Sequence, residues 1–492
     1  MSSSLSLAAR ALIALIFMVG FYALAFGISA GLLYLPYAEW VYGGRIHLRL
    51  GLFSVITAGL ILYSIVPRRD RFEAPGPLLE PTRHPRLFAR LTKLSKAVGQ
   101  PLPTETYLVS DVNAWVSRRG GFMGIGSRRV MGLGLPLLQV LTASQLEAVL
   151  AHEFGHYHGG DTSLGPMIYK TRATIGRTLQ SLATDPKEGF SILSLIQAPF
   201  RWYATVYLRV TLAISRAQEF AADRLAARTV GSTSLIEGLR TVHRVSGASN
   251  HYLNNEVLPI IRRGFRPPLV DGFALFLSNE WAGKLMDESL TAELGSPDRG
   301  AYDTHPPLKD RIAALQAFPV GAASDNTSAL SLLDHVEDLE AALTASWLID
   351  GKTRLEPIDW NDTGGTVLLP QWSELAKRSA NALKGATLES LYAEAKDIDH
   401  FARKLDVWRT GIPWDSVRQY ASSVLGAALA CVLHARGWAV RNNPGELWLT
   451  KGEAKVNPFH ILSQITSGEM NDQSWREFVS GLDVDLQTPL EQ

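Results

Sequence analysis

Cysteine is nearly absent from this chain of 492 residues, which contains only Cys431. A single thiol forms neither an internal disulfide nor a cysteine-based zinc cluster, so a disulfide-stabilised fold is excluded. The chain also lacks a charge excess, because 48 Lys and Arg balance 47 Asp and Glu to a formal net charge of +1. Nothing in this balance indicates a polyanionic partner, and we expect no nucleic-acid binding. Because the chain has a single cysteine, any zinc must be held by histidine and carboxylate side chains.

Two long runs without charge stand near the start of the chain. Leu12–Tyr37 has no charged residue and exceeds the roughly 20 residues that a helix needs to cross about 30 Å of hydrocarbon. Leu50–Pro67 is also free of charge and has 18 residues. A cleaved signal peptide is the alternative for the first run, but its apolar core is typically about 7–15 residues long. We therefore predict a two-span membrane hairpin over residues 1–69.

Arginines around these runs predict the orientation of the hairpin in the bilayer. Short segments rich in Lys and Arg stay on the cytoplasmic side of a membrane. We therefore expect both termini, and the domain that follows the hairpin, to face the cytoplasm. The arginines are Arg68, Arg69, Arg71, Arg83 and Arg86 after the second run, against Arg45 and Arg49 in the connecting loop.

The middle of the chain has mainly helical patterns with a small sheet. Apolar residues recur at helical spacing from Leu87 to Val98, and Gly99 is a plausible stop. Thr106–Val109 and Val130–Leu133 are predicted as short strands separated by a glycine-rich turn. A further apolar stretch, Phe190–Ile214, is interrupted by two arginines. We favour a helix outside the bilayer there, with a further span as the alternative.

The last third of the chain has the composition of a folded domain. Eight of the 12 tryptophans fall between Trp347 and Trp475, whereas disordered segments are poor in aromatic residues. We predict a C-terminal α+β domain over residues 319–492. Its expected elements are a buried helix at Gln419–Ala435 and a hairpin of strands Trp438–Val440 and Glu446–Thr450.

One helix is expected to carry a metal-binding motif. Thr142 and Gln145 have the spacing of a capping box, which predicts a helix from there through His158. Within it lies His152-Glu153-Phe154-Gly155-His156. Residues i and i+4 share one helix face, so His152 and His156 can both direct an imidazole at one ion, with Glu153 beside them.

A catalytic zinc site usually has three protein ligands, so one more is needed. A third histidine six residues after the motif is one pattern, but Thr162 occupies that position. The other pattern is a glutamate on a second helix, and Glu219 meets it. Asp223 follows one turn later and can accept the free N–H of a histidine ligand. The alternative is that Glu219 and Asp223 form a solvated helix face with Arg216.

These residues resemble the gluzincin metalloendopeptidase family that includes the heat-shock protease HtpX and the CAAX prenyl proteases. The resemblance runs from about Asp111 to Arg311. It rests on the His-Glu-Phe-Gly-His helix, the Glu219 helix, Asn113-Ala114 before a glycine-rich turn, and Thr304-His305-Pro306-Pro307 followed by Arg311.

The resemblance implies roles for several residues. Asn113 and Ala114 would lie on the edge strand that aligns the substrate. His305 would hydrogen-bond the developing oxyanion, and Arg311 would support the site. The alternative for His305 is a solvent-facing residue in a proline-rich turn. The chain is thus predicted as mainly α, of the α+β class, with a zincin-type helical protease domain and a small β-sheet at residues 70–318.

The predicted function is that of a membrane-anchored zinc metalloendopeptidase. One zinc ion held by His152, His156 and Glu219 would activate water, with Glu153 as the general base. We expect a polypeptide substrate, with misfolded or membrane proteins as one class, and contact with the lipid bilayer. The alternatives are a catalytically silent, chaperone-like scaffold with a retained zinc site, a prenyl-protein-type protease, and an aminopeptidase. An intact Glu153 argues against the scaffold.

The chain also departs from both groups of relatives. CAAX prenyl proteases of this kind enclose their site among many spans, whereas two are predicted here. HtpX-like members usually have a second hydrophobic pair before the glutamate helix, where this chain has Arg201 and Arg209. Neither substrate class follows from the resemblance.

Overall fold

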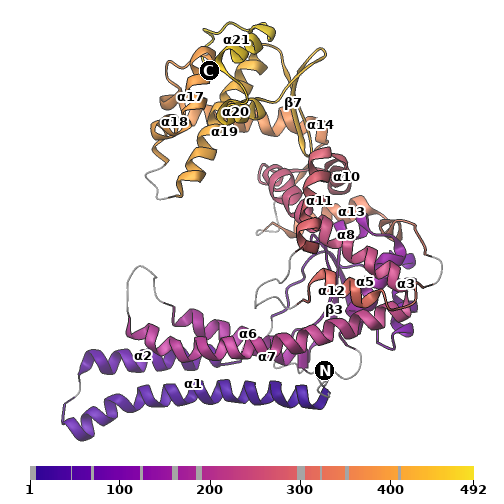
Figure 1. Cartoon of the computed structure of the whole chain (residues 1–492), viewed down its shortest axis with the longest axis vertical. Helices are drawn as coiled ribbons and strands as arrows, with labels where there is room; N and C mark the ends of the chain where they lie inside the picture. The colour runs from indigo at the N-terminus through magenta and orange to yellow at the C-terminus, as the bar shows by residue number, and fades with distance from the viewer. Residues whose placement is uncertain are drawn as a thin grey trace. The chain divides into compact units, whose positions relative to one another are not determined.

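The fold is that of a computed structural model. It describes residues 7–45, 47–67, 71–121, 126–157, 164–183, 191–295, 305–321, 324–348, 354–407 and 412–491. Helices dominate these residues, and the strands form three small sheets. Figure 1 shows the same predominance of helices. The prediction of a mainly α chain of the α+β class is confirmed.

The described chain divides into two compact units. Unit 1 comprises residues 1–246 and 287–336, and unit 2 comprises residues 247–286 and 337–492. The predicted boundaries between residues 69 and 70 and between 318 and 319 do not coincide with this division. Compactness by itself does not establish which segments fold alone, so the three predicted domains stay a prediction.

Four helices of unit 1 lie side by side as a bundle (Figure 1). Buried aromatic and aliphatic side chains join them, including Phe21, Ile61 and Phe200. Polar contacts add to this packing, because Ser64 Oγ and Thr178 Oγ1 are 2.8 Å apart in the buried interior. The four helices are α1 (Leu7–Gly43), α2 (Leu48–Ile65), α6 (Leu164–Ser181) and α7 (Ile192–Thr229).

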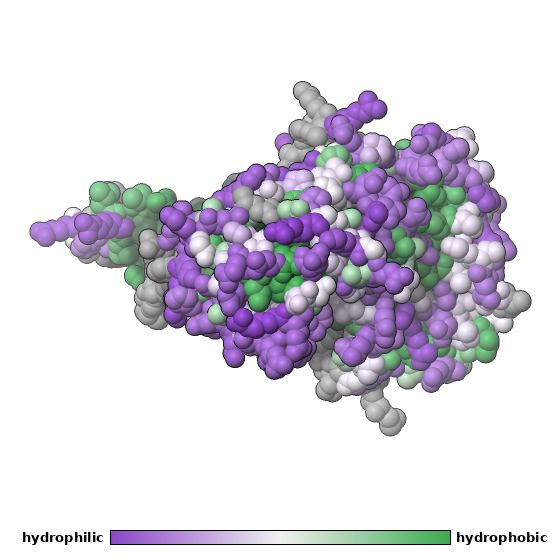
Figure 2. All heavy atoms as spheres, turned by 90° about the horizontal axis from the view of Figure 1, so that it is seen from above, coloured by the Kyte–Doolittle hydropathy of each residue, from purple (hydrophilic) through white to green (hydrophobic). Residues whose placement is uncertain are grey.

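Three helices among the described residues are long and apolar enough to cross a membrane. Two of them, Leu12–Gly43 and Leu48–Ile65, coincide with the predicted hairpin. At the left of Figure 2, hydrophobic side chains form much of the surface of the protruding end where α1 and α2 lie in Figure 1. The third helix, α19 (Trp414–Ala435), is 67% buried over its most apolar window. Its side chains form the core of unit 2, as the predicted buried helix requires.

A three-stranded sheet lies beside the helix that carries the histidine motif. Its strands are β1 (Glu105–Val109), β2 (Ala114–Arg119) and β3 (Arg128–Gly134), in the order β1-β3-β2. Strand β1 pairs parallel to β3, and β2 pairs antiparallel to it. The predicted strands correspond to β1 and β3. The sequence pattern missed β2, which lies in the segment interpreted as a glycine-rich turn and is one of the two edge strands of the sheet.

Helix α5 (Ala143–Gly155) begins as predicted, with a capping box between Thr142 and Gln145. It ends at Gly155, so the prediction that it continues through His158 is wrong at residues 156 and 157. His158 itself lies outside the described residues. His156 is the C-cap and keeps helical backbone angles, φ −60° and ψ −18°, so the i, i+4 relation to His152 survives the helix end.

The start of α5 is held by a segment predicted to belong to the C-terminal domain. The Ala143 and Ser144 N–H groups donate to the carbonyls of Thr327 and Asp325. Arg90 pairs with Glu147 and with Asp325.

The other helices of unit 1 are α3 (Pro85–Ala97), α4 (Leu135–Val140), α8 (Ser232–His251, which continues into unit 2), α12 (Leu308–Leu315) and the 3₁₀ helix Ala329–Leu332. Helix α11 (Glu280–Gly295) joins the two units along the chain.

Unit 2 is built on α19 and a small antiparallel sheet of order β6-β7-β8. The predicted hairpin is confirmed as β6 (Ala439–Asn443) and β7 (Glu446–Lys451), and β8 (Ala454–Val456) adds a third strand. Its other helices include α10 (Leu269–Ser278), α13 (Val336–Ser346), α14 (Trp360–Thr363), α15 (Leu369–Arg378), α17 (Leu388–Lys396), α18 (Ile398–Lys404), α20 (Pro458–Ser467) and α21 (Asp472–Gly481). The short elements are α9 (Leu258–Ile261), α16 (Ala380–Leu383), the π-helices Tyr252–Val257 and Gly364–Leu368, and strands β4 (Phe265–Arg266) and β5 (Glu356–Pro357).

A close contact between α5 and α7 positions the histidine motif. A Cβ atom added to Gly155 would lie 2.8 Å from the Cα of Ala222 on α7. Since backbone atoms cannot move aside as a flexible side chain can, a larger residue at this position forces the two helices apart. Glu219 lies one turn before Ala222, so the same contact sets its distance from the histidines.

We therefore expect Gly155→Ala to lower the free energy of unfolding by about 1–3 kcal/mol, the usual range for overpacking. Gly247→Ala is the control, because Gly247 is exposed inside α8 with nothing within 4 Å of an added Cβ. That change should leave stability unchanged or raise it by up to about 1 kcal/mol. Thermal unfolding of the detergent-solubilised protein, followed by tryptophan fluorescence, measures both. Equal midpoints for the two variants would contradict the packing argument.

Candidate metal centre and active site

The two motif histidines face each other at the C-terminal end of α5. Their Nε2 atoms are 3.2 Å apart, and their rings are nearly perpendicular, at 85°. His152 is 6% exposed, whereas His156 is only partly buried. Two imidazoles that direct the same ring nitrogen at one point are the arrangement predicted from the i, i+4 spacing.

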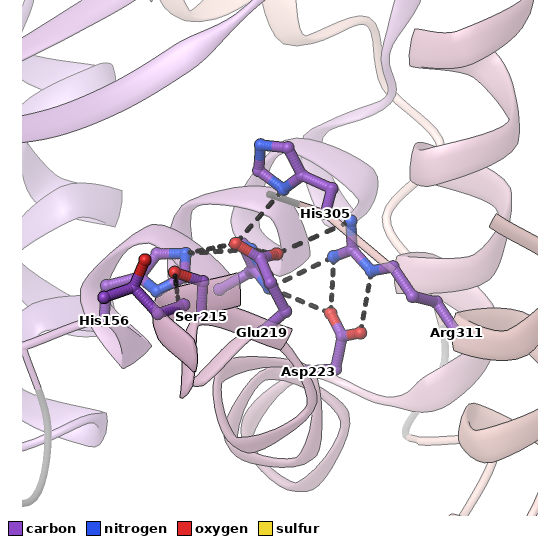
Figure 3. A network of polar contacts seen from close by, with 8 residues as sticks. His156, Ser215, Glu219, Asp223, His305 and Arg311 are labelled. Atoms are coloured by element: carbon purple, nitrogen blue, oxygen red, sulfur yellow. Dashed lines mark hydrogen bonds and ion pairs between the residues drawn. The ribbon is translucent and has the colours of Figure 1, made fainter. Parts of the chain in front are cut away.

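Helix α7 brings a carboxylate to the same point. Glu219 is 6% exposed, and its Oε2 lies 3.4 Å from Nε2 of His152 while its Oε1 lies 3.7 Å from Nε2 of His156 (Figure 3). The alternative of a solvated helix face is therefore wrong for Glu219, and for Asp223, which is 1% exposed. About 60 residues separate these carboxylates from the motif, so only the packing of α7 on α5 brings them together.

His152, His156 and Glu219 form a group that can hold a metal ion, with ligand atoms within 4.8 Å of one another. Two ligands at about 2.05 Å from a tetrahedral zinc ion lie about 3.3 Å apart, close to the spacings observed. Oε2 of Glu219 is buried and has no hydrogen-bond partner among the described residues closer than Nε2 of His152 at 3.4 Å, with Nη1 of Arg311 at 3.8 Å. A buried oxygen without such a partner is costly unless a cation satisfies it, so the residues present fit a metal ion.

Asp223 and Arg311 hold the ring of His152 from behind. Nδ1 of His152 lies 2.9 Å from Oδ1 of Asp223. Arg311, on α12, donates two hydrogen bonds to the same carboxylate, from Nη2 at 2.6 Å and from Nε at 2.8 Å. Arg311 is 5% exposed, so this is a buried, bidentate ion pair. It fixes which nitrogen of His152 carries the proton and leaves Nε2 for a metal.

The carboxylates make the space between the rings favourable for one positive charge. Burial alone would lower the pKa of His152, but hydrogen bonds with Asp223 and Glu219 outweigh it and raise that pKa to about 9. Burial and the neighbouring His152 lower the pKa of His156 to about 4. Burial acts to raise the pKa of Glu219, but hydrogen bonds with His152 and His305 hold it well below its usual value.

Glu153 has a different environment from the other carboxylates of the site. Its burial raises the pKa of the carboxyl to about 7, and the charge of His152 opposes this shift only in part. A general base works best with a pKa near the working pH. Glu153 is therefore suited to proton transfer rather than to a purely structural role.

The resemblance gave roles to His305, Asn113 and Ala114, and the structure places His305 beside a candidate metal ligand and the other two at the start of β2. Nδ1 of His305 lies 3.1 Å from Oε1 of Glu219, and its side chain is 61% exposed. Ala114 is the first residue of β2, and Asn113 precedes it with an exposed side chain. The carbonyl of Asn113 accepts the Gly134 N–H at 2.9 Å. All three residues belong to unit 1, as do the candidate metal ligands.

Sequence reasoning missed Tyr157, the residue after the second histidine. Its hydroxyl donates to the Val116 carbonyl of β2 at 2.8 Å, and the guanidinium of Arg129 stacks over its ring at 4.5 Å. Burial raises the pKa of Tyr157 to about 12, so the hydroxyl remains a donor at neutral pH. No sequence signal links Tyr157 to a carbonyl 41 residues away; the contact exists only because β2 lies beside α5.

Comparison with known proteins covers the region that contains this site. Residues 81–318 match the sequence model of Peptidase family M48. The "Protease HtpX homolog" of Acaryochloris marina (strain MBIC 11017) is 28% identical over 222 residues, which cover 42% of this chain and 70% of that protein. The homolog of the same name from Tropheryma whipplei (strain Twist) is 29% identical over 251 residues, which cover 47% of this chain and 72% of that protein.

A structural comparison gives a weaker match. The crystal structure of S. mikatae Ste24p aligns with 61% of this chain and 65% of that chain, at 15% sequence identity and a TM-score of 0.27. A score this low supports no argument about arrangement, so the assignment rests on the sequence matches. Residues 81–318, which hold both halves of the His-Glu site, are thus similar to peptidase family M48 and to the HtpX proteases, and the predicted resemblance to that family is confirmed.

Proposed function

We propose that this protein is a membrane-anchored, zinc-dependent metalloendopeptidase. The convergence of His152, His156 and Glu219 beside Glu153 carries the proposal, because these residues combine a metal ligand set with a partly buried carboxyl of raised pKa. We assign one zinc ion per chain to the three ligands. Zinc bound there supplies a positive charge that polarises water and lowers its pKa toward ~7.

The protein side chains then divide the work of peptide hydrolysis. Glu153 takes the proton from the attacking water and delivers it to the leaving amine. His305, exposed beside Glu219, donates a hydrogen bond to the carbonyl oxygen as it gains charge. Asp223 and Arg311 keep the ring of His152 in one orientation and tautomer.

The edge of the sheet provides the place for a polypeptide substrate. β2 is an edge strand in the described part of the chain, and such an edge can pair with an extended peptide. We assign substrate alignment to Asn113 and Ala114 at its start. A site that binds backbone in this way suits an endopeptidase of broad specificity, acting on cytoplasmic or membrane-exposed polypeptide.

For the membrane arrangement, we propose that α1 and α2 span the bilayer and that the catalytic residues face the cytoplasm. The excess of arginine after the second span supports this orientation. The side-by-side packing of α6 and the first half of α7 on these helices brings them to the bilayer as well. Ile192, Leu195 and Trp202 of α7 are each more than half exposed and suit contact with lipid.

The first test is replacement of the general base. Glu153→Gln should lower kcat by about 10²–10⁴-fold, the usual contribution of general-base catalysis, while leaving zinc content at one per chain. Casein or membrane-protein cleavage and metal analysis measure the two quantities. Glu237→Gln, half-exposed on α8, is the matched control and should cleave normally. Equal inertness of wild type and Glu153→Gln, both loaded with zinc, would favour the scaffold alternative.

The second test concerns the metal. Chelation should abolish cleavage, and added zinc should restore it. Asp223→Asn removes the carboxylate charge behind His152 with little change in size, and we expect it to weaken zinc affinity by about 10–100-fold. Competition with a chromogenic chelator measures this affinity, and a thermal melt checks that the variant is folded. A folded Asp223→Asn protein with wild-type zinc affinity would show that this contact does not support the metal.

The third test concerns orientation in the membrane. Cys431→Ser provides a cysteine-free background, into which one exposed cysteine is introduced at Tyr42 or at Glu453. An impermeant maleimide should label Tyr42→Cys in intact spheroplasts, because the loop near Tyr42 faces outward in the proposed topology. It should label Glu453→Cys only after lysis. The reverse pattern would place the catalytic residues outside the cytoplasm.

A further inference from the structure

The outward edge of β2 is where a substrate strand would pair, and its polar groups are not equally available. The Asn113 carbonyl is directed at β3, because it accepts the Gly134 N–H at 2.9 Å. Successive residues of a strand direct their N–H and C=O groups to opposite sides. Ala114 and Val116 therefore direct theirs away from β3, toward the open edge.

Ala114 and Val116 differ in what meets them at this edge. Outside the pairing of β2 with β3, the N–H and C=O of Ala114 have no backbone hydrogen-bond partner among the described residues. The Val116 carbonyl accepts the hydroxyl of Tyr157 at 2.8 Å. A substrate strand paired with β2 would direct an N–H at this carbonyl, about 6.8 Å beyond Ala114. The hydroxyl competes with that donor for the carbonyl oxygen.

Tyr157 is held in place from several directions. It follows His156 directly, so the end of α5 fixes its backbone beside the candidate metal centre. The guanidinium of Arg129 covers its ring at 4.5 Å, and Nη1 of Arg129 donates to the Pro101 carbonyl at 3.0 Å. The tyrosine thus lies between the metal-binding helix and the sheet, with its hydroxyl directed at the edge.

We infer that Tyr157 is a positioning residue that ends substrate pairing on β2 by occupying the Val116 carbonyl. The inference rests on the proposed endopeptidase function. A peptide then exchanges backbone hydrogen bonds with Ala114 but not with the Val116 carbonyl. Recognition along this edge is therefore confined to a short stretch of extended backbone. The substrate class is a polypeptide of which only a few residues pair with β2, and this binding depends little on the substrate's side chains.

The test is a backbone N-methyl scan of one fluorogenic peptide that the purified full-length protein cleaves. Each amide N–H of the peptide is replaced in turn by N–CH₃, which removes one donor. In wild type, methylation of the amide opposite Val116 should leave KM unchanged. In Tyr157→Phe the carbonyl is free, so KM for the unmodified peptide should fall by about 2- to 10-fold, the effect of one added hydrogen bond, with kcat nearly constant. Methylation of that same amide should then restore the wild-type KM.

Tyr107→Phe is the matched control, because Tyr107 lies in the same sheet and its hydroxyl donates to Glu105 instead. This variant should show the wild-type methylation profile. The inference would be overturned if Tyr157→Phe and wild type had identical methylation profiles. It would also be overturned if methylation of the amide opposite Val116 changed the KM of the wild type. Those results leave cleavage intact, whereas a wild type that cleaves no peptide would overturn the proposed function and the inference together.

Discussion

The close approach of α5 and α7 is the constraint on which the candidate site depends. Gly155 lets the two backbones meet at Ala222, and the residue one turn earlier on α7 is Glu219. The histidines and the glutamate come from two helices that are far apart in the sequence. Their spacing is therefore set by this packing contact. A site assembled in this way is precise because rigid helices, rather than loops, carry its ligands.

The buried charges around the site balance one another through hydrogen bonds. Asp223 and Glu219 are both buried, and Arg311 together with the histidine rings compensates them. Burial of an unpaired carboxylate is costly, by several kcal/mol for each ion. The bidentate Arg311–Asp223 pair offsets one of these costs within the protein at 2.6 and 2.8 Å, whereas Oε2 of Glu219 has only the longer contacts to His152 at 3.4 Å and to Arg311 at 3.8 Å. This inequality is the physical reason to assign the metal to Glu219 and a supporting role to Asp223.

Local patterns were the reliable part of the prediction. The capping box at Thr142, the apolar periodicity of α3 and the hairpin around Gly445 all depend on residues close in sequence, and each appears as expected. Strand β2 was missed because its short, arginine-ended sequence lacks a clear alternation. Its identity as a strand depends on pairing with β3, and its first residue was singled out only through the family resemblance.

By itself, the sequence determined the two apolar helices, the His-Glu-Phe-Gly-His motif on α5 and the exclusion of cysteine ligands, because composition and i, i+4 spacing are local properties. It offered Glu219 as a third ligand but left a solvated helix face as an alternative. Only the tertiary structure decided that Glu219 is buried against both histidines, that Arg311 pairs with Asp223, and that Tyr157 occupies the edge of β2. Each of these contacts joins segments about 40 or more residues apart, and packing brings them together.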